Sequence, residues 1–224
     1  RIIFPIRDKA GYTIGFAGRA TSKETDDKYK YINSPETPVY TKSSALFGVD
    51  KCDLSSGDVF VVEGYVDLMQ MWSAGVKNVI ASCGTAFTEA HVLALKKLGA
   101  RHLNLMFDGD PAGIKATQRA VHLAYKEEIT TTVYALPEGE DPDSFFKKGG
   151  KLDEVKAVSG LEFLELSGEE LDGPMRSLRR LERTEKALLY FAQNIPEVAA
   201  ILKQRGRLEE LFGPGVLTEL QAAL

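Results

Sequence analysis

The spacing of apolar and polar residues changes along the chain and divides it into three regions. Residues 1–19 alternate around a turn at residues 9–11, which predicts a β-hairpin, and residues 20–51 are polar enough to predict a loop with a short helix. Short apolar runs then alternate with helical patterns across residues 58–150. Residues 160–224 carry Leu, Glu and Arg at helical spacing, so we expect several helices there.

The middle region predicts an α/β fold. Its expected strands are residues 59–62, 78–82, 102–107 and 130–136. Its expected helices are residues 66–74, 88–98 and 111–128, with Asp110 as the N-cap of the third and Pro111 at its first position. Alternating strands and helices predict a mostly parallel sheet with helices on both faces.

Acidic residues follow three of these strands. Glu63 follows the first strand, Asp108 and Asp110 the third, and Asp141 and Asp143 lie just past the fourth. Ligands of open parallel sheets bind beyond the carboxyl ends of the strands, so we expect these acids to converge at one edge. Two carboxylates ~4 Å apart repel by about 4 kcal/mol at an effective dielectric near 20. Oxygen ligands select hard cations such as Mg²⁺ or Mn²⁺, which commonly serve phosphate chemistry. The alternative is a turn, an N-cap and a solvated loop.

Composition and charge add limits to this interpretation. The 224 residues are 44% hydrophobic and 27% charged, and the chain shows neither a signal peptide nor an apolar run long enough for a membrane helix. The two cysteines form no CxxC pair, which argues against a zinc ribbon or a disulfide scaffold and fits a reducing cytoplasm. The net charge is −4, but residues 1–51 hold nine basic and six acidic residues, or +3, which leaves −7 elsewhere. A basic lobe beside an acidic one suits a polynucleotide and a metal, with ordinary surface charge as the alternative.

Three short motifs resemble a known nucleic-acid enzyme domain. VVEGYVD (61–67), CGT (83–85) and FDGDPAG (107–113) resemble the Toprim domain of primases, topoisomerases and some nucleases. RIIFPIRDKAGYTIGFAGR (1–19), KYINSPET (30–37) and LPEGEDPD (136–143) are similar to the RNA-polymerase core of bacterial replicative DNA primases. The resemblance covers about residues 1–150. It implies a Toprim-like, mostly parallel sheet flanked by helices.

The resemblance also implies a domain organisation. A small α+β lobe over residues 1–56 would precede a metal-binding Toprim domain at 57–150 and a helical region at 151–224. That last region is either the core's own helical subdomain or the start of a helicase-binding region, because residues 182–202 resemble its opening. The chain begins inside a strand pattern without Met, and family members begin with a zinc module, so we expect a fragment of a longer chain.

The activity implied by the resemblance is primer synthesis. Members make short RNA primers on single-stranded DNA from ribonucleoside triphosphates by metal-dependent nucleotidyl transfer. The resemblance makes Glu63, Asp108 and Asp110 catalytic and assigns them, with Asp141 and Asp143, to more than one Mg²⁺ or Mn²⁺ ion; Glu63 is either a ligand or a base. It assigns nucleotide or nucleic-acid contact to Arg1, Arg7, Lys30, Tyr31, Asn33, Tyr65 and Asp67. From the residues alone, Tyr31, Tyr40 and Tyr65 fit either a core or base stacking.

Partners and alternatives complete these expectations. We expect a single-stranded DNA template, an RNA primer and a cytoplasmic replisome, with no membrane and no zinc in this fragment. The longer protein would also meet the replicative helicase and single-strand-binding protein. One alternative is a topoisomerase-type Toprim fragment, which the KYINSPET block disfavours. Another is an adaptor that binds helicase through its tail.

Overall fold

The computed structural model describes residues 1–22, 29–82 and 85–194. The chain divides into two compact units, residues 1–167 and 168–224, which are treated separately below. The first two residues of the CGT motif (83–85) and the end of the segment 182–202, which resembles a helicase-binding region, lie outside the described residues. No helix in the described part of the chain is long and apolar enough to cross a membrane.

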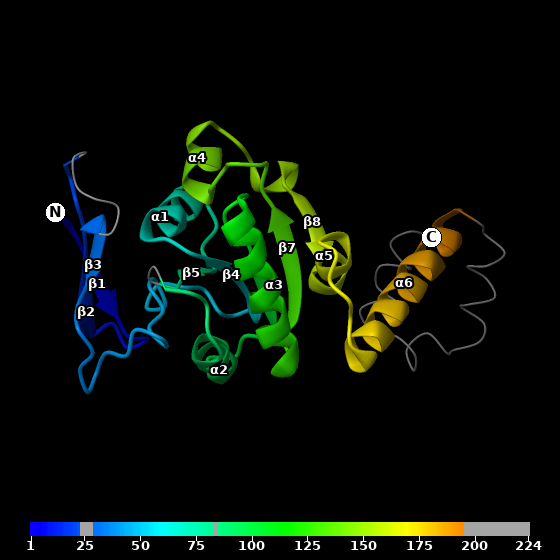
Figure 1. The fold of residues 1–224 in the computed structure, drawn as a ribbon, viewed down its shortest axis with the longest axis horizontal. Coiled ribbons are helices and arrows are strands. Elements are labelled where there is room, and N and C mark those ends of the chain that lie inside the picture. The colour runs from blue at the N-terminus through cyan, green and yellow to red at the C-terminus, as the bar shows by residue number, and fades with distance from the viewer. Residues whose placement is uncertain (23–28, 83–84, 195–224) are drawn as a thin grey trace. The chain divides into compact units, whose positions relative to one another are not determined.

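The first unit opens with a three-stranded antiparallel sheet (Figure 1). The predicted hairpin is confirmed, and Phe4, Ile6 and Ala17 form its buried face against Tyr40. In the stretch 20–51, where we expected a loop with a short helix, residues 31–33 pair with the second strand, and residues 23–28 lie outside the described residues. The strands are β1 (Ile2–Arg7), β2 (Thr13–Arg19) and β3 (Tyr31–Asn33).

A five-stranded sheet of order β5-β4-β6-β7-β8 follows, and it confirms the α/β class. Four strands are parallel, and β8 runs antiparallel to β7. The apolar sequences of β4 and β5 fit strands that are buried on both faces. The strands are β4 (Asp58–Val62), β5 (Val79–Ala81), β6 (His102–Leu105), β7 (Thr130–Ala135) and β8 (Lys156–Ser159).

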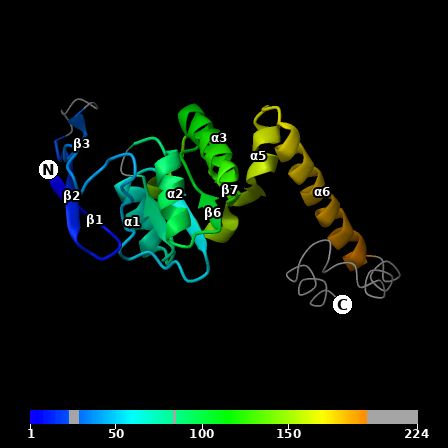
Figure 2. The same cartoon turned by 90° about the horizontal axis from the view of Figure 1, so that it is seen from below.

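Helices cover both faces of this sheet. Helices α1 and α4 pack together, and α1 lies against Phe60 and Val62. Helix α3 contacts α2, α5, β6 and β7, and Figure 2 shows α3 beside α5. The predicted caps are confirmed, since Thr88 and Asp110 accept backbone N–H groups at the starts of their helices. The helices are α1 (Tyr65–Ser73), α2 (Glu89–Lys97), α3 (Pro111–Lys126), α4 (Pro142–Lys147) and α5 (Gly160–Leu166).

Residues 151–167 belong to the first unit, although we expected a helical region from 151 onward. They contain a 3₁₀ turn (Leu152–Glu154), strand β8 and helix α5. Strand β8 forms because it pairs with the edge of β7 and its Val158 side chain is buried. The proposed domain limits stay a prediction.

The second unit begins with α6 (Gly173–Asn194), which confirms a helix in the tail. The Asp172 carboxylate accepts the Met175 backbone N–H at 3.0 Å near the start of this helix. Arg179 and Glu182 form an ion pair of 3.1 Å one turn apart. Whether this unit is a core subdomain or a helicase-binding region stays a prediction.

Candidate metal and nucleotide site

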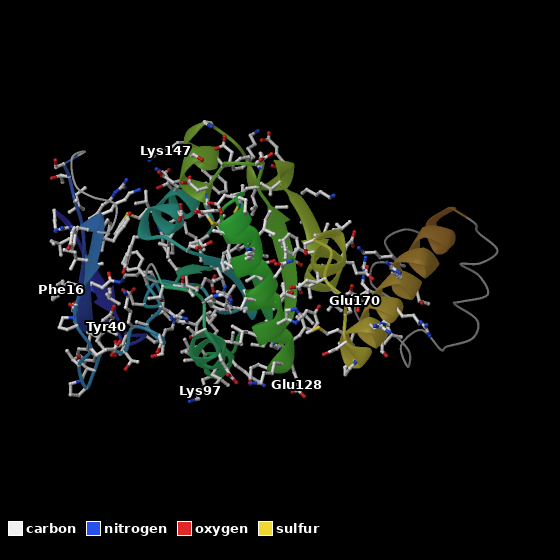
Figure 3. The ribbon with its side chains drawn as sticks, in the orientation of Figure 1. Phe16, Tyr40, Lys97, Glu128, Lys147 and Glu170 are labelled. Atoms are coloured by element: carbon white, nitrogen blue, oxygen red, sulfur yellow. The ribbon has the colours of Figure 1, made fainter. Side chains whose placement is uncertain are left out.

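The carboxyl ends of β4 and β6 place two acids side by side. Glu63 follows β4 directly, and Asp108 lies in the turn between β6 and α3. After β4 the chain continues to β5 on one side of this pair, and after β6 it continues to β7 on the other side. Ligand sites of open α/β sheets form at such a switch point. Lys147 of α4 marks this edge in Figure 3, and Lys97 and Glu128 mark the opposite one.

Two glycines hold the turn after β6 in place. A Cβ atom on Gly109 would lie 2.2 Å from the carbonyl oxygen of Pro137, and one on Gly113 would lie 2.1 Å from that of Asp108. The Gly109 N–H donates to the Glu140 carbonyl at 2.7 Å, and the Gly139 N–H donates back to the Gly109 carbonyl at 3.0 Å. These bonds join the loop that carries Asp108 to the loop that leads to Asp141.

The carboxylates at this edge repel one another. Burial, together with the charges of Glu63, Asp141 and Asp110, raises the pKa of Asp108 to about 6. Burial likewise raises the pKa of Asp67 to about 6, followed by the charges of Asp108 and Asp141. Burial also raises the pKa of Glu63, and the Asp108 backbone N–H opposes that rise. The predicted convergence of the acids at one edge is confirmed for Glu63, Asp108, Asp110 and Asp141.

Asp110 and Asp141 have a structural role as well. The Asp110 Oδ1 atom accepts the Gly113 N–H at 2.7 Å, and the Asp141 Oδ1 atom accepts the Ser144 N–H at 2.6 Å. Both residues are therefore N-caps, which agrees in part with the alternative interpretation of these acids as a turn, an N-cap and a solvated loop. Their charges still raise the pKa of Asp108, so each of these residues both caps a helix and belongs to the acidic cluster.

The donor set fits a hard divalent cation. Among the described residues, Glu63 Oε1 and Asp143 Oδ1 are buried without a hydrogen-bond partner. No three His, Cys, Asp or Glu side chains in the described ranges are arranged to hold one ion together. Mg²⁺ commonly takes only one or two carboxylates and completes its shell with water and substrate phosphate oxygens. The residues present therefore suit an ion that arrives with a phosphate ligand.

Asp67 belongs to the acidic edge, although the resemblance assigns it nucleic-acid contact. Its Oδ2 atom accepts the Gly64 N–H at 2.9 Å, and its Oδ1 atom accepts the Asp143 N–H at 3.2 Å. It thus connects the start of α1 to the first turn of α4. A Cβ atom on Gly64 would lie 2.5 Å from Asp67 Oδ2, which explains the glycine after Glu63.

Tyr65, the first residue of α1, packs against the N-terminal sheet. Its side chain is 1% exposed, and its hydroxyl donates to Asn33 Oδ1 at 3.0 Å. Its ring stacks on Phe4 and Tyr31, with centroids 5.1 and 5.7 Å away. Tyr40 is fully buried as well. Tyr65 and Tyr40 are therefore core residues and not base-stacking residues in this structure. Asn33 accepts the hydrogen bond of the Tyr65 hydroxyl.

The basic residues of the N-terminal sheet lie at different places. Arg1 donates to the carbonyls of Gly18 and Tyr29, and Arg7 lies 3.7 Å from Asp50. Lys30 is exposed next to Tyr31.

Arg19 of β2 is a further basic residue of this sheet, and no contact was predicted for it. Its guanidinium lies 5.8 Å from the Tyr31 ring centre. Burial raises the pKa of Tyr31, Arg19 lowers it, and Asp67 and Asp143 raise it. Tyr31 therefore marks the place where the basic sheet meets the acidic edge. In the sequence, Arg19 closes the primase-like segment 1–19 and adds to the excess of basic residues in this region.

Known proteins share both parts of this arrangement. Residues 60–146 match a family described as Toprim-like, and residues 1–53 match the N-terminal domain of the DNA primase catalytic core. A DNA primase domain from Pseudomonas aeruginosa is 30% identical, with a TM-score of 0.65, over 99% of this chain and 71% of that one. The chain belongs to the bacterial DNA primase family.

Other primases extend the comparison. The RNA polymerase domain of the Mycobacterium tuberculosis primase is 35% identical, with a TM-score of 0.66, over 80% of this chain and 62% of that one. A DNA primase of Chlamydia trachomatis is 46% identical over 67% of this chain and 26% of its own length. The chain thus spans about a quarter of the length of such curated relatives.

Proposed function

We propose that this chain is part of the catalytic core of a bacterial DNA primase and takes part in template-directed synthesis of short RNA primers. The observation that carries the proposal is the convergence of Glu63, Asp108, Asp110 and Asp141 at one sheet edge, beside a basic sheet. Its relatives are named DNA primases, and one solved primase catalytic domain that resembles it is bound to single-stranded DNA. The primase-specific match of residues 1–53 favours this reading over a topoisomerase-type fragment.

The proposed chemistry is attack of a nucleotide 3′-hydroxyl on the α-phosphate of the next ribonucleoside triphosphate, with loss of pyrophosphate. Asp108, Asp110, Asp141 and Asp143 would hold Mg²⁺ or Mn²⁺, which when bound neutralises the phosphate charge. Glu63 either joins that set or accepts the proton of the attacking hydroxyl. Its raised pKa and its buried, unpartnered Oε1 atom suit both roles.

The template would bind to the basic N-terminal sheet. Arg1, Lys30 and Arg19 would contact phosphates there. Tyr31, whose pKa is raised in part by the charges of Asp67 and Asp143, would contact a nucleotide. For the longer protein, we propose a place in the cytoplasmic replisome, with the helicase and single-strand-binding protein as partners. Zinc has no role in the proposed site.

Metal and nucleotide binding tests the acidic part of the proposal. Mn²⁺ and a ribonucleoside triphosphate are titrated calorimetrically into the wild type, the double variant Asp108→Ala/Asp110→Ala, and Asp153→Ala as an exposed control. We expect metal-dependent triphosphate binding in the wild type and the control, and its loss in the double variant. Absence of binding in the wild type, or full binding by a folded double variant, would contradict the proposal.

Template binding tests the basic part separately. Fluorescence anisotropy with labelled single-stranded DNA is measured across salt concentrations for the wild type and Lys30→Ala. Loss of one phosphate contact should weaken binding and reduce the salt slope by about 1. Lys97→Ala removes an exposed lysine at the opposite edge and should leave the slope unchanged (Figure 3). An unchanged slope in Lys30→Ala would remove Lys30 from the template surface.

A further inference from the structure

Helix α4 supplies a cation to one of the proposed metal ligands. The Nζ atom of Lys147, which is labelled in Figure 3, lies 2.6 Å from Asp143 Oδ2, one helical turn away. The Asp143 side chain is 21% exposed and that of Lys147 is 53% exposed, so a largely buried carboxylate is paired with a cation that solvent reaches. The second carboxylate oxygen of Asp143, Oδ1, is buried and has no hydrogen-bond partner among the described residues.

The backbone holds Asp143 at the acidic edge. Its N–H group donates to Asp67 Oδ1 at 3.2 Å, and α4 packs against α1, which carries Asp67. Asp67 is buried, and the charges of Asp108 and Asp141 act on it. The Asp143 carboxylate therefore belongs to a region that is already crowded with negative charge. Lys147 offsets a charge that would otherwise add to this repulsion.

The neighbouring ion pair of α4 is of a different kind. Lys148 binds the Oε1 atom of Glu140, and the Oε2 atom of Glu140 accepts the Ser144 hydroxyl. Both carboxylate oxygens of Glu140 therefore have partners within the chain, and Glu140 is not among the proposed metal ligands. Lys147 and Lys148 carry the same charge at the same end of one helix, but of the two it is Lys147 that contacts a proposed ligand.

Lys147 would compete with a divalent ion for Asp143. The carboxylate that would bind the ion already holds an ammonium group, and two cations on one carboxylate repel each other. The Lys147 side chain is exposed and has a flexible stem, so its ammonium group can move into solvent at little cost. We propose that Lys147 is the counter-ion of Asp143 in the metal-free chain and leaves this place when a divalent ion binds to Asp143. This inference rests on the proposed function, and it adds a residue that sets how tightly metal binds.

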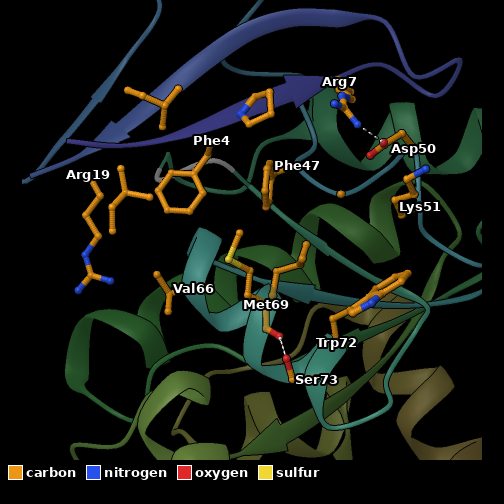
Figure 4. A pocket seen from close by; sticks show the side chains of 15 residues that line it. Phe4, Arg7, Arg19, Phe47, Asp50, Lys51, Val66, Met69, Trp72 and Ser73 are labelled. Carbon is orange, nitrogen blue, oxygen red and sulfur yellow. Dashed lines mark hydrogen bonds and ion pairs between the residues drawn. The ribbon is translucent and has the colours of Figure 1, made fainter.

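Mn²⁺ affinity tests this exchange. Binding of Mn²⁺ alone is followed by electron paramagnetic resonance of the free ion for the wild type and three lysine variants. We expect Lys147→Gln to bind Mn²⁺ about fivefold more tightly, because it removes both the competing ion pair and a repelling charge. Lys148→Gln removes the same charge one residue further on and should change the affinity by less than about twofold, because exposed charges are screened. Lys51 lines a pocket between β1 and α1 that contains no proposed metal ligand (Figure 4), so Lys51→Gln should change nothing.

A double-variant cycle separates the exchange from a general effect of charge. Asp143→Asn removes the carboxylate that both cations need, so in that background Lys147→Gln should act no more strongly than Lys148→Gln. Lys147→Arg keeps the ion pair and should bind Mn²⁺ like the wild type. The NMR resonance of the Lys147 ammonium group, assigned through Lys147→Arg, should shift when Mg²⁺ is added, whereas that of Lys148 should not. Thermal melts check that each variant is folded.

Two kinds of result would overturn the proposal. Weaker Mn²⁺ binding by folded Lys147→Gln would show that Lys147 orients Asp143 for the metal and does not compete with it. Equal effects of Lys147→Gln and Lys148→Gln, or an effect of Lys147→Gln that persists in full in the Asp143→Asn background, would reduce Lys147 to an ordinary surface charge. Both results leave the proposed metal site standing. Absence of Mn²⁺ binding by the wild type would instead remove the metal site and the exchange together.

Discussion

Replacing Asp108 by Asn should stabilise the chain at neutral pH, even though it removes a residue of the proposed site. Burial first, and then the like charges of Glu63, Asp141 and Asp110, raise the pKa of Asp108 from 3.8 to about 6. An amide of nearly the same shape carries no charge. The substitution therefore removes the repulsion and keeps the turn between β6 and α3.

The size and sign of this effect follow from the pKa. A shift of about two units corresponds to about 3 kcal/mol, and solvent screening of this half-buried side chain lowers the expected gain to about 1 kcal/mol. A carboxyl with a raised pKa in the fold holds its proton longer there than in the unfolded chain. The wild type therefore loses stability as pH rises from about 4 to about 6, and the Asn variant lacks that loss.

Thermal melts without metal test this reasoning at two pH values. At pH ~7.5 the melting temperature of Asp108→Asn should exceed that of the wild type by roughly 2–4 °C, and at pH ~4.5 the difference should largely disappear. Asp153→Asn, on an exposed carboxylate, should change little at either pH. Added Mg²⁺ should stabilise the wild type more than the variant. A lower melting temperature for the variant at pH ~7.5, or an equal gain at both pH values, would refute the reasoning.

Three further predictions concern the framework of the site. Gly109→Ala should destabilise the chain by about 1–3 kcal/mol in urea unfolding, because its Cβ would meet the Pro137 carbonyl oxygen at 2.2 Å; Gly173→Ala, with no atom within 4 Å, should not. Tyr65→Phe should cost about 1 kcal/mol through loss of the bond to Asn33, and Tyr12→Phe, at a side chain 74% exposed, should cost nothing measurable. Burial lowers the pKa of His91 to about 4. The neutral imidazole therefore contributes its full stabilisation of the fold above pH ~6.5, and the free energy of unfolding falls by about 3 kcal/mol as the pH drops from ~6.5 to ~4. His91→Gln should flatten that part of the urea-derived pH profile, and an unchanged profile would show that another group titrates there.

Local signals explain what could be predicted from the sequence. The strands, the caps at Thr88 and Asp110, and the placement of Glu63 and Asp108 after strands depend on residues close together in the chain. Strand β8 was missed because its four residues gain their conformation from pairing with β7. The bonds between the loops at Gly109 and Glu140 join residues that are far apart in sequence, so no periodicity could reveal them.

Tyr65 shows a second limit of sequence reasoning. Its position after Glu63-Gly64 suits a residue that contacts a ligand, and a tyrosine fits a core or a stacking surface equally well. Its burial depends on the N-terminal sheet, because Phe4 and Tyr31 from β1 and β3 pack on its ring. Only the packing of the N-terminal sheet on the Tyr65 ring decides whether this residue belongs to the core or to a stacking surface.

The acidic edge is built in a way that favours chemistry over stability. Helices α1 and α3 begin at this edge, and the positive ends of their dipoles partly offset the carboxylate charges there. The offset is incomplete, since the pKa values of Glu63, Asp67 and Asp108 remain raised. A fold selected for stability alone would replace Asp108 by an amide. A cation bound at the proposed site would relieve this repulsion, so we expect metal binding and folding stability to be coupled there.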